Sequence, residues 1–498
     1  MDVSPEKSGK IKINGTTPVV YPYSNFFPAN ANVTFEAIEA FGYDFDEWTG
    51  GLTGDSNPDS MVLTCDTEVT ANFLSQGEPN VLYFPHIASN IGDWETEIVV
   101  INTSDTQTIN GIFQAYDNSG SLVSDDIEVT LAPHGRSEVT VGEEFVDSED
   151  IGYILFYGYS DAMVGYTKFY VKGQYRVAVP AVPESEINTG DIYISHIASG
   201  GNTNPWSTGL SLLNTTSSAK EVTIEFDNGT TKTVSLLGNE HKAFSISSLF
   251  GGAAQPGIDS GVVKDAIGVI GLELFTNNGL NWMSGILLKD DTTQNIYYPH
   301  TASGNGWATG IVAYNPSESI CNITITPYSA AGEELIAAAV PPLGGKEKYI
   351  GSVSNLGLPV ETAWLQIEAS NPITGFELFS QPGQLGGYTG VGISGTERVF
   401  AKIEKDGGTG IAFVNIEETT ASILLTAYDN NGNAIATETI ALAGHAKMVD
   451  TAANLFSPPQ DISNATYITY SSDLDLVGFQ LNVSSDAMML DGLPALGE

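Results

Sequence analysis

Apolar and polar residues alternate with a period of two along most of the chain. Residues 127–131 read Ile-Glu-Val-Thr-Leu, and residues 222–226 read Val-Thr-Ile-Glu-Phe. This alternation predicts β-strands with one buried face. Turn sequences such as Asp-Asn-Ser-Gly at 117–120 and Asp-Asn-Asn-Gly at 429–432 predict tight hairpins, because Asn and Gly tolerate positive φ. No long segment has the 3.6-residue period of a helix, so the sequence predicts an all-β protein.

A short motif returns at regular intervals, and we call it the opening motif. It reads Tyr-Phe-Pro-His-Ile-Ala-Ser from residue 83, Tyr-Ile-Ser-His-Ile-Ala-Ser from 193 and Tyr-Pro-His-Thr-Ala-Ser from 298, with a divergent copy from 399. The copies are roughly 105 residues apart and fill residues 83 to about 496. The aligned positions are His86, His196, His300 and Lys402 in the opening motifs, Asn102, Asn214, Asn315 and Asn415 after the next strand, and Gly165, Gly271, Gly375 and Gly478 near the end of each copy.

The length of a copy suits an immunoglobulin-like β-sandwich of about seven strands. A β-propeller would require two blades per copy, and this alternative stays open. We expect four tandem immunoglobulin-like sandwiches arranged as an extended string. The acidic linker at 183–191 predicts that the first two sandwiches are the most mobile pair. The expected boundaries are 83–190, 191–297, 298–397 and 398–496, the last copy being divergent.

Residues 9–75 differ from the repeats. An alternating strand at 33–37 leads into aromatic residues that supply core area for a small β domain. The distinctive positions are Gly42, Tyr43, Phe45, Trp48, Gly50, Asn57, Pro58, Val69, Thr70, Ala71 and Phe73. In these positions the stretch resembles the divergent InlB B-repeat family of bacterial surface proteins.

That resemblance implies a small β-grasp-like fold in a secreted or wall-attached bacterial protein, where such domains serve as spacers or adhesive units. The family has no catalytic residues, so none is carried over. The four repeats resemble β-sandwich modules of bacterial exoproteins only loosely.

The charge, the cysteine content and the apolar runs of the chain exclude several classes of partner and of structure. The 60 acidic and 18 basic residues give a net charge of −42, which disfavours nucleic acid and anionic membrane surfaces as partners. Cys65 and Cys321 fall in different expected domains, so no disulfide framework is predicted. No apolar run reaches the roughly 18 residues of a membrane span, and the start has no signal-peptide core. We expect an extracellular or cell-surface protein whose signal has been removed or lies upstream.

The histidines of the opening motifs and the tryptophans that follow them allow two interpretations. In the favoured one, the tryptophan covers the end of the sandwich as a core or interface residue, and the histidine is structural, bonded to a loop carbonyl beneath it. Alternatively, an exposed tryptophan beside polar groups stacks on a sugar ring, and the string binds glycans. His134, His241 and His445 are expected to share one later position. The candidate glycan-binding residues are Trp94, Trp206, Trp307, His86, His196 and His300.

Two further hypotheses concern metals and catalysis. Asp117 and Asp429 open loops dense in oxygen ligands and are weak candidates for calcium, although turn formation also explains them. No other cofactor is indicated. The sequence lacks the common catalytic motifs, so we expect a non-enzymatic stalk or adhesive module that engages a surface protein or polysaccharide and is capable of self-assembly. The remaining alternative is the accessory C-terminal region of a larger secreted hydrolase.

Overall fold

The computed structural model of the chain describes residues 1–200, 205–277, 279, 281–302, 304, 306–388, 394–458 and 460–497. The fold is all-β, as predicted. Helical structure within the described residues is confined to short turns, which are α1 (Val141–Glu144), η1 (Ser148–Asp150), η2 (Glu184–Glu186), η4 (Ile246–Phe250), η5 (Val353–Leu356) and η6 (Ala452–Leu455).

The N-terminal domain consists of two three-stranded sheets, β1-β6-β4 and β2-β3-β5. Trp48 is fully buried between them and lies 6.2 Å from Phe35 and 5.1 Å from Phe45, ring centre to ring centre. The aromatic cluster therefore forms the core, as expected, while the β-grasp-like assignment stays a prediction. The strands are β1 (Asp2–Ser4), β2 (Gly9–Ile13), β3 (Asn32–Glu39), β4 (Tyr43–Gly50), β5 (Asp59–Val62) and β6 (Val69–Ser75).

The remaining strands form four groups along the chain, and we call each group a unit. Unit one joins β10-β9-β12-β7-β15 to β11-β8-β13-β14 around an apolar cluster that includes Phe84, Val100 and Phe156. Its strands are β7 (Asn80–Phe84), β8 (Trp94–Asn102), β9 (Ile109–Asp117), β10 (Ile127–Leu131), β11 (Arg136–Thr140), β12 (Ile151–Gly158), β13 (Met163–Val171), β14 (Tyr175–Pro180) and β15 (Val182–Pro183).

Unit two joins β16-β21-β18-β19 to β20-β17-β22-β23. Its strands are β16 (Ile192–Ile194), β17 (Trp206–Asn214), β18 (Lys220–Phe226), β19 (Thr231–Leu236), β20 (His241–Ser245), β21 (Gly261–Lys264), β22 (Val269–Asn277) and β23 (Trp282–Leu288).

In units three and four, one long strand, β28 or β35, joins the strands of the unit into a single sheet. The strands of unit three are β24 (Thr293–Tyr298), β25 (Ala308–Tyr314), β26 (Ile323–Ser329), β27 (Lys348–Ser352), β28 (Thr362–Gln381) and β29 (Gln384–Tyr388). Those of unit four are β30 (Gly395–Phe400), β31 (Gly408–Asn415), β32 (Ala421–Tyr428), β33 (Ala434–Leu442), β34 (Lys447–Thr451), β35 (Tyr467–Val483) and β36 (Leu490–Pro494). The immunoglobulin-like assignment and the domain boundaries stay predictions.

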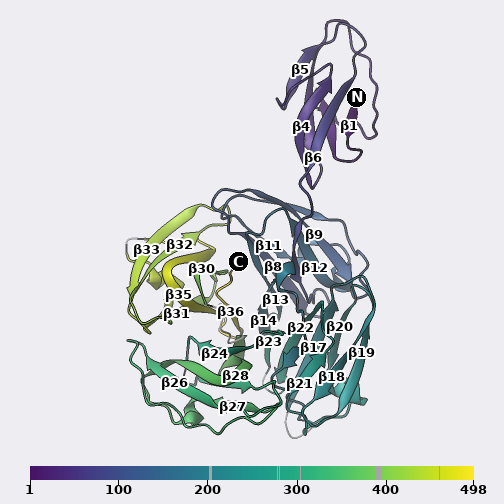
Figure 1. Cartoon of the computed structure of the whole chain (residues 1–498). Helices are drawn as coiled ribbons and strands as arrows, with labels where there is room; N and C mark the ends of the chain where they lie inside the picture. Colours follow the sequence, from purple (N-terminus) through teal and green to yellow (C-terminus); the bar gives the residue numbers. More distant parts are fainter. Residues whose placement is uncertain are drawn as a thin grey trace.

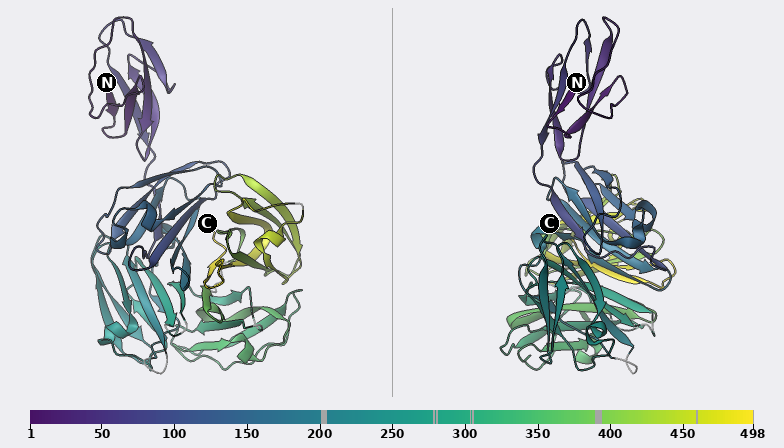
Figure 2. Two further views of the ribbon diagram at one scale, coloured as in Figure 1. Left: turned by 180° about the vertical axis from the view of Figure 1, so that it is seen from behind. Right: turned by 90° about the vertical axis from the view of Figure 1, so that its right-hand side faces the viewer.

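The four units form a closed ring, and the N-terminal domain projects from its rim (Figures 1 and 2). Around the centre, β14 contacts β23 and β36, and β29 contacts the same two strands. Units one and four share an apolar cluster that includes Val99, Tyr166, Val399 and Tyr467. The expected extended string is therefore wrong.

The ring closes because the sheets bury apolar side chains on both faces. In β8, Ile98, Val99, Val100 and Ile101 are all fully buried, since alternate residues face the core of unit one and the surface of unit four. The linker at 183–191 is anchored rather than free. Its Asn188 side chain donates hydrogen bonds to the carbonyls of Val269 and Leu288 in unit two.

Candidate functional site

A repeated polar contact lies at the junctions between successive units. The opening-motif histidine of one unit meets the first residue of a strand in the next unit, namely β20, β27 or β34. His86 Nδ1 lies 3.2 Å from His241 Nε2. The lysine ammonium groups that take the place of His241 at the next two junctions donate to the opening-motif histidines. The Nζ–Nδ1 distances are 2.8 Å for Lys348 and His196, and 2.6 Å for Lys447 and His300.

The opening-motif histidines are uncharged and connect successive units. Burial lowers the pKa of His86 to about 4, and it lowers the pKa of His196 and His300 to about 3 with help from the adjacent lysine charge. With the lysine as the donor, Nδ1 of His196 and His300 accepts and the ring proton resides on Nε2. Their structural role agrees with the sequence interpretation, but the expected partner, a carbonyl beneath the tryptophan, is wrong.

The later histidines occupy two positions rather than one. His134 and His445 hold a left-handed conformation, φ 56°, in the turn before β11 and β34. Asn239 and Lys346 have the same conformation before β20 and β27, at φ 60° and 59°. His241 lies two residues farther along, where the other units have Arg136, Lys348 and Lys447, so the expected common position is wrong.

Two buried glutamates face these joints. Glu273 on β22 and Glu377 on β28 are completely buried, and none of their carboxylate oxygens has a hydrogen-bond partner among the described residues. Burial raises both pKa values well above the usual range, opposed by Lys348 and Lys447 respectively. Burial also lowers the pKa of Lys447 to about 7, opposed by Glu377. Burial therefore favours the uncharged carboxylic acid of Glu273 and of Glu377 at these two junctions.

The position of Glu273 and Glu377 is occupied by other residues in the first and last units. Thr167 takes it in unit one, where the joint is the pair His86 and His241, and Gln480 takes it in unit four. Sequence reasoning missed this position. The available signal was a single acidic residue in the apolar strands Ile-Gly-Leu-Glu-Leu-Phe and Thr-Gly-Phe-Glu-Leu-Phe, at 270–275 and 374–379.

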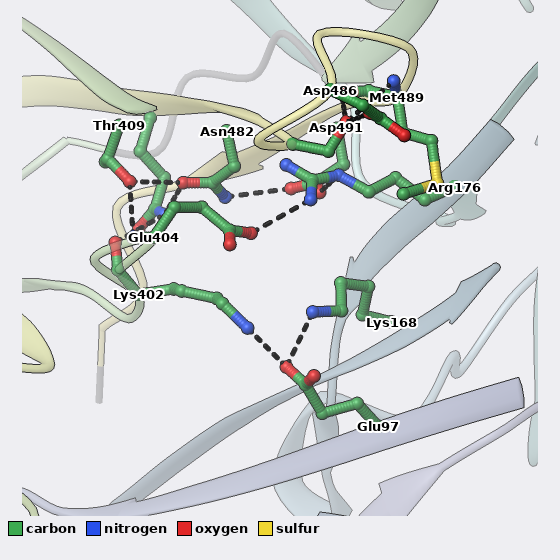
Figure 3. Close-up of polar contacts among 12 residues, drawn as sticks. Glu97, Lys168, Arg176, Lys402, Glu404, Thr409, Asn482, Asp486, Met489 and Asp491 are labelled. Carbon is green, nitrogen blue, oxygen red and sulfur yellow. Dashed lines mark hydrogen bonds and ion pairs between the residues drawn. The ribbon is translucent and has the colours of Figure 1, made fainter. Parts of the chain in front are cut away.

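The junction between units four and one contains a buried network that we call the closing cluster (Figure 3). Glu97 Oε1 on β8 accepts from Lys168 Nζ on β13, at 2.8 Å, and from Lys402 Nζ in the opening motif of unit four. Burial opposes ionisation, but the two ammonium groups lower the pKa of Glu97 to about 2. The ion pair with Lys402 joins residues far apart in sequence and so ties the ring shut.

A second part of the closing cluster surrounds Arg176 on β14. Its guanidinium contacts Asp491 on β36 and lies 3.0 Å, Nη1 to Oε1, from Glu404. Asn482 Nδ2 donates to Asp491 Oδ1 at 2.8 Å, which fixes the second carboxylate oxygen. Of the 18 basic residues in the chain, Arg136, Lys168, Arg176 and Lys402 are buried at this one junction.

The two calcium candidates form turns that dock onto neighbouring units. Asp117 Oδ1 accepts from the amides of Ser119 and Ser121, and Asp429 Oδ1 does the same with Asn431 and Asn433, at 2.8 and 2.9 Å in each case. The carbonyl oxygens of the residues that follow them accept from the next unit. These contacts are His241 N to Asn118 O, 3.0 Å, and Arg136 N to Asn430 O, 2.9 Å. Within the described residues, no group of three or more His, Cys, Asp or Glu side chains is placed to hold a metal ion.

The tryptophans that follow the opening motifs are half-buried at the junctions. Trp94 and His86 both lie against Phe169, with ring centres 6.1 and 5.1 Å away. Trp307 packs in the cluster between units three and four. Trp206 and His196 line a cavity of about 390 Å³ between units two and three. The structure therefore brings each candidate tryptophan near its histidine and keeps Asp117 and Asp429 in separate turns.

Residues 3–77 match the divergent InlB B-repeat domain. This match confirms the resemblance and indicates a bacterial surface protein with a cell-surface or extracellular location. Among solved structures, the partial N-terminal region of an enterococcal surface protein aligns at 8% identity over 68% of this chain and 90% of that chain, with a TM-score of 0.17. None of the curated proteins matches the chain. In the part of the chain that the structure describes, every helix is too short or too polar to cross a bilayer.

Proposed function

We propose that the chain is a non-enzymatic part of a bacterial surface protein, in which the InlB-B-like domain carries a ring of four sandwich units that serves as a preformed platform for a surface protein or polysaccharide. Closure of the ring at the junction that holds Glu97, Lys402 and a shared apolar cluster carries this proposal, because a closed ring keeps the four units in fixed relative positions. A fixed surface binds a partner without the loss of entropy that ordering a flexible string would entail.

The chemistry of the junctions supports a non-catalytic role. The closing cluster is buried, and its carboxylates are tied to lysine, arginine and asparagine side chains. The other junctions hold histidines whose low pKa values and neighbouring lysines suit joints rather than general bases near neutral pH. The strongly negative surface suits a saline exterior, where salt screens the repulsion between carboxylates.

Surface display is tested on intact cells of the source bacterium. Antibodies against the ring should label unpermeabilised cells, and proteinase K added outside should remove the signal while a cytoplasmic control protein survives. Labelling that requires permeabilisation would contradict the proposal. The purified chain, immobilised on beads, should then capture a surface protein or polysaccharide from isolated envelopes, and the isolated N-terminal domain serves as the comparison.

A further inference from the structure

We infer that the cavity between units two and three binds one pyranose ring of a neutral or amino-bearing carbohydrate. This inference rests on the proposed surface function and assigns it a site and a ligand class. The volume, about 390 Å³, lies in the lower part of the range of roughly 300–1,000 Å³ typical of small-ligand pockets.

The walls of the cavity offer apolar surface for stacking. Trp206 is half-buried, Phe275 and Ile258 are almost fully buried, and Leu378 of unit three also lines the cavity. Phe275 is fixed from behind because its ring stacks on Phe376 of unit three, with centres 5.2 Å apart. Phe275 also lies against His196, with ring centres 5.8 Å apart, so the apolar face of a pyranose is expected to pack on the exposed part of Trp206, with its hydroxyl groups pointing toward polar partners.

Polar residues also line the cavity. His196 accepts from Lys348 through Nδ1, so its Nε2 carries a proton and serves as a donor to a hydroxyl. Asp259 is exposed and also lines the cavity, so its carboxylate is the natural acceptor. Its backbone amide donates to both carboxylate oxygens of Asp227 at 3.2 Å, which brings a second negative charge to this rim.

These charges define the sugar class. Two carboxylates on a chain of net charge −42 repel uronic and sialic acids, whereas they attract a protonated amine on the sugar. Lys348, which contacts His196, is also held by the backbone carbonyl of Asp259, so it is not positioned to bind an anionic group.

The other copies of the opening motif provide internal controls. Ten positions separate His196 from Trp206, against eight between His86 and Trp94 and seven between His300 and Trp307. Residues 201–204 of this longer segment lie outside the described chain, so the residues on either side define the site. All three tryptophans pack against neighbours: Trp206 lies 5.9 Å from Trp282 and Trp94 lies 5.4 Å from Tyr175, ring centre to ring centre, and Trp307 packs within an apolar cluster between units three and four. The copies therefore differ in the length of the segment before the tryptophan.

Binding is tested with the full chain by isothermal titration and saturation-transfer NMR. The probes are cellotetraose as a neutral sugar, a glucosamine tetramer as an amino sugar and tetragalacturonate as an anionic sugar. We expect the first two to bind, the amino sugar more tightly, and the third not to bind. Trp206→Ala should weaken binding at least tenfold, whereas Trp94→Ala and Trp307→Ala should change it less than twofold.

Several results would overturn the inference. They are wild-type affinity in Trp206→Ala, no binding of either sugar class, or binding of tetramethylammonium and the amino sugar without the neutral one, which would indicate a simple cation site. If Trp206→Ala fails to fold, Asp259→Asn on the exposed rim decides the matter. It should reduce the preference for the amino sugar at least threefold at unchanged Tm, and an unchanged preference overturns the inference.

The outcome is separable from the proposed function. Sugar binding by a chain that is not displayed on cells would remove the proposed function and keep the site. Display without sugar binding would do the reverse.

Discussion

The closing junction and the junction between units three and four both bury ionisable side chains, but the first keeps them charged and the second favours their neutral forms. At the closing junction, Glu97 is paired with Lys168 and Lys402, and these ammonium groups hold its pKa near 2, so the charges are kept. At the other junction, Glu377 has no hydrogen-bond partner among the described residues, and burial shifts the pKa values of Glu377 and Lys447 toward their neutral forms.

The difference shows that the contribution of a buried charge to stability depends on the junction in which it lies. Burying an ion is costly unless a partner and hydrogen bonds compensate it, and removal of one partner then leaves the other uncompensated. The closing junction should therefore depend strongly on each of its charges, whereas the other junction should tolerate neutral replacements.

The largest effect is expected for Arg176→Met. This change leaves the carboxylates of Glu404 and Asp491 buried without their cation, and it should lower the free energy of unfolding by about 3–5 kcal/mol. Denaturant unfolding measures this loss. Lys12→Met is the control, because the exposed pair of Lys12 and Glu36 should contribute less than about 1 kcal/mol. Equal losses in the two variants would show that the closing cluster is not special.

Glu97→Gln should cost about 3 kcal/mol at pH 7, because Lys168 and Lys402 lose their shared carboxylate. The folded pKa of Glu97, about 2, lies below the ordinary value of 4.5. Its stabilising contribution is therefore complete above pH 4.5 and is lost as the pH falls toward 2. The difference in Tm between wild type and variant should shrink over that interval. A difference independent of pH would contradict the ion-pair account.

A matched pair of glycines tests the docked turn of unit four. Gly432 and Gly229 both have positive φ, 81° and 80°, so alanine strains both turns equally. A Cβ at Gly432 would collide with the carbonyl oxygen of Pro133 in unit one, whereas a Cβ at Gly229 meets nothing within 4 Å. Gly432→Ala should therefore cost about 1–3 kcal/mol more than Gly229→Ala in thermal or urea unfolding. Similar losses would mean that the turn does not hold the ring closed.

The smallest effect, and one of opposite sign, is expected for Glu377→Gln. Because burial raises the folded pKa of Glu377, its contribution is favourable below pH 4.5 and is lost as the pH rises toward the folded value. Replacing it with a neutral amide should raise Tm by about 2–4 °C at pH 7 and by less at pH 4.5. Calorimetry at the two pH values measures this change. A fall in Tm at pH 7 would show that Glu377 and Lys447 form a stabilising ion pair.

The sequence predicted the strands, the four opening motifs and the N-terminal domain, because period-two alternation and a dense local motif are local signals. Ring closure depends on contacts between distant residues such as Glu97 and Lys402, and no local pattern encodes them. One signal was present in the continuous apolar run from Ile98 to Ile101. Such a run indicates a strand buried on both faces, which a string of isolated sandwiches does not need.

The turn residues show a different limit of sequence reasoning. Asp117 and Asp429 have the composition of a ligand loop, but the same oxygen atoms accept hydrogen bonds within a tight turn. Composition does not separate the two uses. The docked position of Asn118 against His241 depends on the neighbouring unit, which lies outside the reach of any turn pattern.

Closure of the ring also limits how the number of repeat units in the chain can change during evolution. A linear array lengthens or shortens by one repeat at a time, since each end can be copied or lost. Here the divergent fourth unit supplies Lys402 to Glu97 of the first, so it has two neighbours like every other unit. Gain or loss of one unit would separate this pair and open all the contacts at the centre at once. Duplication therefore has to preserve four units or rebuild every junction together.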